Sequence, residues 1–309
     1  MFSLEFFPPK TQAGFEKMSK NVDDLSIIAP HYFSITYGAG GSTQQSTAKA
    51  LQLLMDKQLD VAPHLSCVGS TTEELKNLIL SYKERGIKRI VALRGDLPSG
   101  MGRYGECRYA SDLVTLIRNI TGDWFNIEVA AYPEMHPQAS SPQEDLKNFI
   151  TKVKAGANGA ITQYFYNIDA YFRFVDELAK HGITIPITAG LMPITNYSQL
   201  ARFSDACGAE IPRWLRLRLQ HFYDDIKSMQ DFASDVLASM CEKLIQGGVP
   251  GIHFYTLNQA PATLAIYQKL NLQFLPAQPK LLNNFNDKDN SLFPKSLFLP
   301  SSGGNVAFT

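Results

Sequence analysis

The chain has 309 residues, of which 45% are hydrophobic and 19% are charged, so it can bury a large core. The charges of its 29 basic and 29 acidic residues cancel, which argues against a basic surface for binding nucleic acid. The sequence contains no apolar run of 18 residues, so no membrane span is expected. The four cysteines are far apart and form no Cys-x-x-Cys pair, so we expect reduced thiols in a cytoplasmic protein, without disulfides or a zinc site.

Short apolar segments rich in branched residues alternate with helical patterns along the chain. In chain order, the sequence predicts strands at residues 3–7, 32–37, 61–66, 89–94, 127–132, 160–164, 185–191 and 251–256. It predicts helices at residues 12–28, 42–57, 109–120, 142–155, 168–181 and 261–270, and helical segments within 195–247. A further helix is predicted after Ser70, because Glu73 follows three residues later in the pattern of a capping box.

Eight strand-then-helix units in sequence predict parallel strands that close into a (β/α)8 TIM barrel. An open, doubly wound sheet is the alternative, but no dinucleotide fingerprint opens the chain. We expect a single barrel domain at residues 1–277. The polar segment 278–309 is expected to be a poorly ordered C-terminal tail.

Polar groups follow several of the predicted strands. The apolar run Ile90–Leu93 stops abruptly at Arg94, Gly95 and Asp96, where a glycine would let a ligand approach the backbone between two charged side chains. A plain turn is the ordinary alternative for this segment. Because a barrel gathers the carboxyl ends of its strands at one mouth, six strand ends with polar groups together favour a ligand site.

For three single residues, a role in a ligand site also competes with an ordinary structural interpretation. Glu5 lies within an apolar strand, where a charged carboxylate is costly unless it is paired or protonated. It would face water at a sheet edge, but a closed barrel has no edge. His64 and Gln163 end two further strands, and for each of them a structural role in the core is the alternative.

The motifs that the sequence lacks narrow the chemistry. It contains no P-loop, no His-Glu-x-x-His helix and no Gly-x-Ser-x-Gly elbow. The glycines of segment 100–105 have dinucleotide-loop spacing but do not open a helix, so a plain loop is the better interpretation. Acidic residues at the strand ends are mixed with His and Gln, and no metal site is predicted.

Seven segments carry a resemblance to a known family: Ser3–Lys10, Phe33–Ala39, Ala62–Leu65, Ala92–Pro98, Ala130–His136, Ile161–Gln163 and His253–Asn258. In this order they are similar to bacterial methylenetetrahydrofolate reductases over about residues 1–272. The resemblance implies a flavin-bearing barrel in which NADH or NADPH reduces FAD. Reduced FAD then converts 5,10-methylenetetrahydrofolate to 5-methyltetrahydrofolate, a ping-pong reaction that feeds methionine biosynthesis.

The resemblance also implies roles for individual residues. Glu5 is similar to the general acid that protonates N10 of the folate and so opens the methylene bridge to an N5 iminium. Asp96 is similar to the carboxylate beside the flavin and pterin that favours this cation. The flavin-contacting positions are Thr36, Tyr37, Ala39, His64, Arg94, Gly95, Asp96, Tyr109, Ala110, Tyr132, His136, Asp145, Asn148 and Lys152. The substrate-binding positions are Asp96, Gln163, Gln199 and Gln259.

One departure from the family lies at Gln259, where well-studied relatives carry an arginine that holds the far end of the substrate. A neutral amide cannot form a charge-assisted pair with the glutamate carboxylate of a folate. The resemblance to bacterial members implies NADH as the hydride donor, and no cluster of basic residues suggests a pocket for the 2′-phosphate of NADPH. The resemblance further implies a homo-oligomer.

Three other functions are compatible with parts of the pattern. The first is a different flavin barrel, such as a proline-dehydrogenase-like oxidoreductase. The second is an aldolase-type barrel with Lys152 as its Schiff base. The third is a non-catalytic folate-binding subunit, which the presence of Glu5, Asp96 and Gln163 argues against.

Overall fold

The computed structural model describes residues 1–37, 41–95, 105–222 and 225–270. The chain divides into two units, Met1–Leu270 and Asn271–Thr309, and the second lies outside the described residues. The expected domain boundary at residue 277 and the expected tail therefore lie outside the described residues, as do Ala39 and Asp96.

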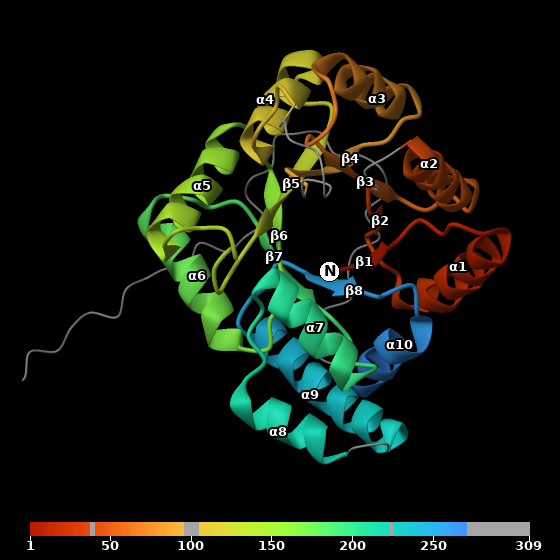
Figure 1. Ribbon diagram of the computed structural model, residues 1–309, viewed down its shortest axis with the longest axis vertical. Coiled ribbons are helices and arrows are strands. Elements are labelled where there is room, and N and C mark those ends of the chain that lie inside the picture. Colours follow the sequence, from red (N-terminus) through yellow and green to blue (C-terminus); the bar gives the residue numbers. More distant parts are fainter. Residues whose placement is uncertain (38–40, 96–104, 223–224, 271–309) are drawn as a thin grey trace, which may run out of the picture. The chain divides into compact units, whose positions relative to one another are not determined.

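Eight parallel strands close into a barrel in the order β1 to β8, which confirms the predicted fold. Figure 1 shows the strands around the centre and the helices outside them. The strands are β1 (Phe2–Phe6), β2 (Tyr32–Ile35), β3 (Val61–Ser66), β4 (Arg89–Leu93), β5 (Asn126–Ala131), β6 (Gly159–Thr162), β7 (Ile187–Leu191) and β8 (Ile252–Tyr255).

Helices alternate with the strands and cover the outer face of the barrel (Figure 1). They are α1 (Gln12–Leu25), the 3-10 turn η1 (Ser26–Ile28), α2 (Gly41–Asp56), α3 (Thr72–Glu84), α4 (Ala110–Thr121), α5 (Pro142–Lys154), α6 (Ile168–Lys180), α7 (Tyr197–Cys207), α8 (Arg213–His221), α9 (Ile226–Gln246) and α10 (Ala260–Lys269). The predicted helical stretch 195–247 thus holds α7, α8 and α9, with Pro212 as the N-cap of α8 and Asp225 as that of α9.

The capping box of α3 lies one residue later than the sequence predicted. The Thr71 side chain accepts a hydrogen bond from the Glu74 backbone N–H at 3.2 Å, and the Glu74 carboxylate accepts one from the Thr71 N–H at 2.8 Å. The prediction of Ser70 with Glu73 is therefore wrong. Both pairs have the same spacing, and the extended backbone that an N-cap needs is found at Thr71.

Alternation along β1 decides which of its side chains enter the barrel. Phe2 packs edge-on against Tyr267 of α10, with ring centroids 5.9 Å apart, so Phe2 faces the helices. Successive strand residues point to opposite faces, so Leu4 shares the helix-facing side while Ser3 and Glu5 face the barrel interior. In the interior, a buried cluster of Tyr32, Ala62, Val91 and Ile161 fills the space between the strands.

An ion pair lies at the opposite end of the strands from the predicted site. Arg89, the first residue of β4, pairs with the buried carboxylate of Glu128 in β5. Its guanidinium also stacks over the ring of Tyr32, 4.5 Å from the centroid. Removal of one partner from a buried ion pair is strongly destabilising. We therefore interpret Arg89 and Glu128 as residues that stabilise the barrel and not as catalytic residues.

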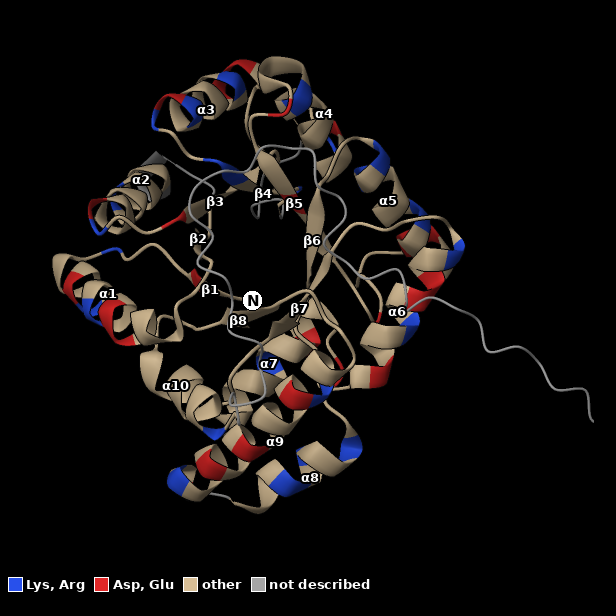
Figure 2. Cartoon of the chain, turned by 180° about the vertical axis from the view of Figure 1, so that it is seen from behind, with Lys and Arg blue, Asp and Glu red and all other residues tan. Residues whose placement is uncertain are grey.

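Charged residues lie mainly on the outer helices, where both signs are interspersed (Figure 2). Cys67, Cys107, Cys207 and Cys241 are free thiols. In the part of the chain that the structure describes, no helix is long and apolar enough to cross a membrane.

Candidate active site

The Glu5 carboxyl lies inside the barrel between two imidazoles. Its Oε2 atom is 3.4 Å from Nε2 of His64 in β3 and 3.6 Å from Nε2 of His253 in β8. Glu5 is 7% exposed, so the alternative in which it faces water is wrong. Burial lowers the pKa of His64, with the Glu5 charge opposing the shift in part, so the His64 ring is neutral near pH 7.

His253 and Ser3 join this group, although neither of them was predicted to be a site residue. Nδ1 of His253 is 2.8 Å from the Ser3 hydroxyl oxygen, and the two residues are paired between β8 and β1. Ser3 lies two residues before Glu5, on the same face of β1. Period-two alternation of polar residues in two apolar strands, Ser3 with Glu5 and His253 with Tyr255, was the signal that could have identified them.

The end of β4 forms a tight backbone turn against β3. Gly95 has a φ of +83°, and a Cβ atom built on it would lie 1.8 Å from the Ser66 hydroxyl oxygen. That hydroxyl donates a 2.9 Å hydrogen bond to the Arg94 carbonyl. The Arg94 guanidinium reaches the side-chain oxygen of Gln138. The missing side chain at Gly95 therefore lets the turn pack against Ser66, and Arg94 places one cation at this strand end.

Four of the predicted flavin positions meet at the end of β5 and on α5. The rings of Tyr132 and His136 contact edge-on, with centroids 4.5 Å apart. The His136 backbone N–H donates to Asp145 at 2.8 Å. Lys152 donates to the Ala130 carbonyl at 2.5 Å, and burial lowers its pKa to about 8, with Asp145 opposing the shift. The ammonium is thus held close to the end of the strand.

The remaining predicted flavin positions lie around the barrel ends. The Thr36 backbone N–H bonds the Phe6 carbonyl at 3.0 Å, and the Tyr37 hydroxyl accepts a bond from Gln44 at 2.7 Å. Tyr109 is the N-cap of α4, and Ala110 is the first residue of that helix. The Tyr109 ring is exposed.

The structure brings one predicted substrate position, Gln163, next to a predicted flavin position, Tyr132. Gln163 and Tyr132 line the same small cavity. Gln199 lies in the first turn of α7, while Gln259 is the exposed N-cap of α10 and caps it with no side-chain bond. Asn148 is exposed on α5.

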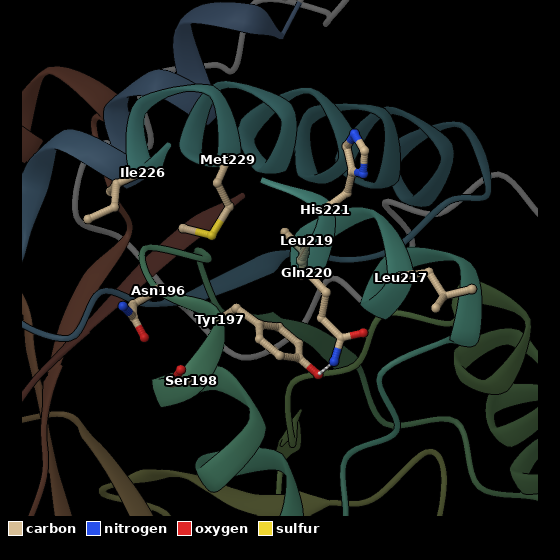
Figure 3. A pocket seen from close by; sticks show the side chains of 9 residues that line it. All are labelled: Asn196, Tyr197, Ser198, Leu217, Leu219, Gln220, His221, Ile226 and Met229. Carbon is tan, nitrogen blue, oxygen red and sulfur yellow. Dashed lines mark hydrogen bonds between the residues drawn. The ribbon is translucent and has the colours of Figure 1, made fainter. Parts of the chain in front are cut away.

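A separate cavity of about 580 Å³ lies among α7, α8 and α9 (Figure 3). In it, Gln220 donates a 3.1 Å hydrogen bond to the Tyr197 hydroxyl. The lining residues are Asn196, Tyr197, Ser198, Leu217, Leu219, Gln220, His221, Ile226 and Met229. None of these lining residues is a predicted site residue. We therefore assign the candidate site to the strand ends and not to this cavity.

Comparisons with known proteins identify the family of this chain. The sequence model of the family described as methylenetetrahydrofolate reductase matches residues 1–271. A 5,10-methylenetetrahydrofolate reductase of Escherichia coli (strain K12) is 40% identical over 272 residues, which cover 88% of this chain and 90% of that protein. A protein of Oryza sativa subsp. japonica, named a probable methylenetetrahydrofolate reductase (NADH), is 35% identical over 286 residues, covering 88% of this chain and 48% of that protein.

The fold also has a solved counterpart. An uncharacterized protein from Clostridium thermocellum, which binds two copies of 5-methyl-5,6,7,8-tetrahydrofolic acid, aligns with a TM-score of 0.61 and 17% sequence identity. The alignment covers 86% of this chain and 93% of that one, and it shows the shared barrel. The family match over residues 1–271 and the 40% identity to the Escherichia coli enzyme together show that the chain belongs to the methylenetetrahydrofolate reductase family.

Proposed function

We propose that this chain uses FAD and a nicotinamide, NADH in preference to NADPH, to reduce 5,10-methylenetetrahydrofolate to 5-methyltetrahydrofolate in a ping-pong reaction. Methylenetetrahydrofolate reductase activity follows from the family match, while the cofactor, the donor and the order of steps are the proposal. The observation that carries the proposal is the buried Glu5 carboxyl with His64 and His253 against it, because folate reduction needs a proton donor.

The chemistry on the folate assigns Glu5 its role. Glu5 gives a proton to N10, the bond from N10 to the methylene carbon breaks, and the N5 lone pair forms the iminium cation. Proton transfer leaves Glu5 as a carboxylate, and hydride addition to the methylene carbon then makes the methyl group. Asp96, which lies outside the described residues, is proposed to favour the cation by its negative charge.

FAD, when bound, would supply the hydride carrier between nicotinamide and folate. The residues near the ends of β4 and β5 suit such a dinucleotide. Arg94 and Lys152 provide two cations for a diphosphate, and Gly95 lets the turn that carries Arg94 pack against Ser66. Tyr132 and His136 add a ring pair beside them. Gln163, Gln199 and Gln259 are proposed to contact the substrates.

The other expectations belong to the same proposal. The name of the rice relative supports NADH, and the free thiols support a reducing, cytoplasmic setting. A homo-oligomer, a role in methionine biosynthesis, and a reductase domain spanning residues 1–277 are proposed from the family resemblance.

A test starts from the colour of the purified protein. We expect flavin absorption bands, release of FAD and not FMN on denaturation, and formation of 5-methyltetrahydrofolate. Initial rates with NADH should exceed those with NADPH. A colourless protein that cannot be reconstituted with FAD would overturn the proposal. Oxidation of proline, borohydride trapping of a carbonyl substrate on Lys152, or folate binding without turnover would each favour one of the alternative functions.

A further inference from the structure

The two imidazoles beside Glu5 point at the same carboxyl oxygen. Nε2 of His64 and Nε2 of His253 are both buried, and neither has a hydrogen-bond partner within the described residues. Their 3.4 Å and 3.6 Å separations from Oε2 of Glu5 are slightly longer than a hydrogen bond. A small rotation of the Glu5 side chain would close either gap, and catalytic hydrogen bonds often tighten only when substrate binds.

The far side of the His253 ring has a partner already. Its Nδ1 atom lies 2.8 Å from the hydroxyl oxygen of Ser3. A serine hydroxyl can donate to Nδ1, which leaves the single ring hydrogen of a neutral imidazole on Nε2. That N–H would then face Glu5. His253 is fully buried and Ser3 is 3% exposed, so water does not compete strongly for these positions.

We propose that Ser3 fixes His253 in the tautomer with hydrogen on Nε2, and that this N–H stabilises the Glu5 carboxylate as Glu5 gives its proton to folate. The proposal rests on the proposed role of Glu5 as general acid. His253 acts through Glu5 in this proposal, so it is a positioning residue. The arrangement is a chain of hydroxyl, imidazole and carboxyl groups in which Ser3 and Glu5 come from one strand and His253 from its neighbour.

The other titratable groups that face Glu5 are Tyr32, Tyr255 and His64, and none of them is a charged donor. Tyr32 in β2 and Tyr255 in β8 have pKa values raised by burial, and they stay neutral. The Tyr255 hydroxyl already donates to the Thr162 carbonyl at 2.7 Å. His64 in β3 is a neutral ring on the same carboxyl oxygen, because burial lowers its pKa. His253 is the ring whose orientation a second side chain fixes.

The first measurement needs no turnover. In the full-length protein labelled with 15N-histidine, the ring resonances of His253 report which nitrogen carries hydrogen. We expect hydrogen on Nε2 in the parent chain and in Ser3→Thr, which keeps the hydroxyl. We expect a shift toward Nδ1 in Ser3→Ala. Hydrogen on Nδ1 in the parent chain, or an unchanged ring in Ser3→Ala, would overturn the proposal.

The second measurement separates the two half-reactions by stopped-flow absorbance. His253→Leu removes the N–H and should slow folate reduction about 10- to 100-fold, the worth of a hydrogen bond to a charged group. It should also move the basic limb of that step's pH profile to higher pH, because a donor that favours the carboxylate is lost. His253→Gln keeps an N–H and should recover part of both effects. Reduction by the nicotinamide should stay unchanged.

Controls separate this proposal from the proposed function. His181→Gln, at the exposed end of α6, should leave both half-reactions and the pH profile unaltered. Equal slowing of both half-reactions in His253→Leu, with an unmoved pH profile, would show a merely structural role and overturn the proposal. If Glu5→Gln abolishes folate reduction while the His253 variants change nothing, this inference fails and the proposed function stands. If Glu5→Gln retains folate reduction, Glu5 is not the acid, and both fail.

Discussion

Gly95 and Ser66 approach so closely that no side chain fits between them, since a Cβ atom at Gly95 would lie 1.8 Å from the Ser66 hydroxyl oxygen. We expect Gly95→Ala to weaken FAD binding, because it would push Ser66 away from the Arg94 carbonyl and shift the turn that carries the Arg94 guanidinium. The dissociation constant, measured by quenching of flavin fluorescence, should rise by more than tenfold, or about 1.4 kcal/mol.

Gly86→Ala is the matched control for this substitution. Gly86 has a φ of +79°, close to the +83° of Gly95, but nothing lies within 4 Å of a Cβ built on it. Its variant therefore carries the left-handed backbone strain of about 1–2 kcal/mol without the clash. Equal loss of FAD from the two variants would mean that the contact with Ser66 does not matter for the cofactor.

The ammonium of Lys152 should make FAD binding depend on pH. Burial lowers its pKa from 10.5 to about 8, so the charged form is present below that pH and is lost above it. A diphosphate pairs with the charged form. FAD affinity should therefore fall as pH rises through about 8, by roughly 10- to 100-fold if the pair contributes about 1.5–3 kcal/mol. Fluorescence titrations of the apoprotein on either side of this pH measure the effect.

Lys152→Arg provides the comparison, because a guanidinium stays charged throughout this pH range. Its FAD affinity should lack the pH dependence even where its absolute affinity differs. Linkage requires the converse effect as well: bound FAD should raise the pKa of Lys152. A parent protein whose FAD affinity is level across this range would place the diphosphate away from Lys152.

Gln259→Arg should tighten folate binding without affecting the chemical step. Gln259 is the exposed N-cap of α10 and makes no side-chain capping bond, so its replacement removes no capping hydrogen bond from the helix. A new pair with the glutamate carboxylate of the folate would be exposed, and such pairs contribute about 0.2–1 kcal/mol. We expect KM for the folate to fall about 2- to 5-fold with kcat unchanged, since the contact is remote from the reacting carbon.

Gln259→Lys tests whether charge alone is sufficient. Lysine lacks the planar fork that holds a carboxylate with two hydrogen bonds, so it should recover less of the effect. Added salt should weaken the gain in both variants. If KM does not change in either variant, residue 259 does not face the substrate.

The barrel itself was readable from the sequence because each strand is a short apolar run followed by a helical pattern. Each of the eight predicted strands has its counterpart, with ends that differ by at most two residues. The sequence predicted only that Glu5 and His64 lie at the same end of the barrel. It did not predict that their side chains are neighbours. Their contact depends on the stagger between β1, β2 and β3, which pairs Glu5 with Ser34 and Ser34 with Ala62. Stagger is a property of barrel closure and leaves no local pattern in the sequence.

His253 was missed for a related reason. It lies in the middle of an apolar strand, where a lone histidine has an ordinary structural interpretation, and its partner Ser3 is 250 residues away. Only closure of β8 onto β1 brings the two together. The position of the α3 capping box was predicted wrongly for a local reason. Ser70 with Glu73 and Thr71 with Glu74 have the same spacing, so the spacing alone cannot choose between them.

The Glu5→Gln substitution separates the two half-reactions most sharply. Gln is nearly isosteric with Glu, and it keeps an oxygen that can accept a hydrogen bond from His64 or His253. Its amide N–H groups are not acidic enough to protonate N10. Hydride transfer from the nicotinamide needs positioning but no acid, so reduction by NADH should proceed at close to its normal rate. Folate reduction should slow by about 10²–10⁴, the usual contribution of general acid catalysis.

Stopped-flow absorbance of each half-reaction decides between three outcomes for this variant. Loss of the folate step alone would support Glu5 as the acid. Equal slowing of both steps would instead give Glu5 a structural role within the barrel, as expected for a buried carboxyl that orders its neighbours. Normal folate turnover would require another donor within reach of N10. His64 is poorly suited to that task because burial lowers its pKa and leaves its ring neutral near pH 7.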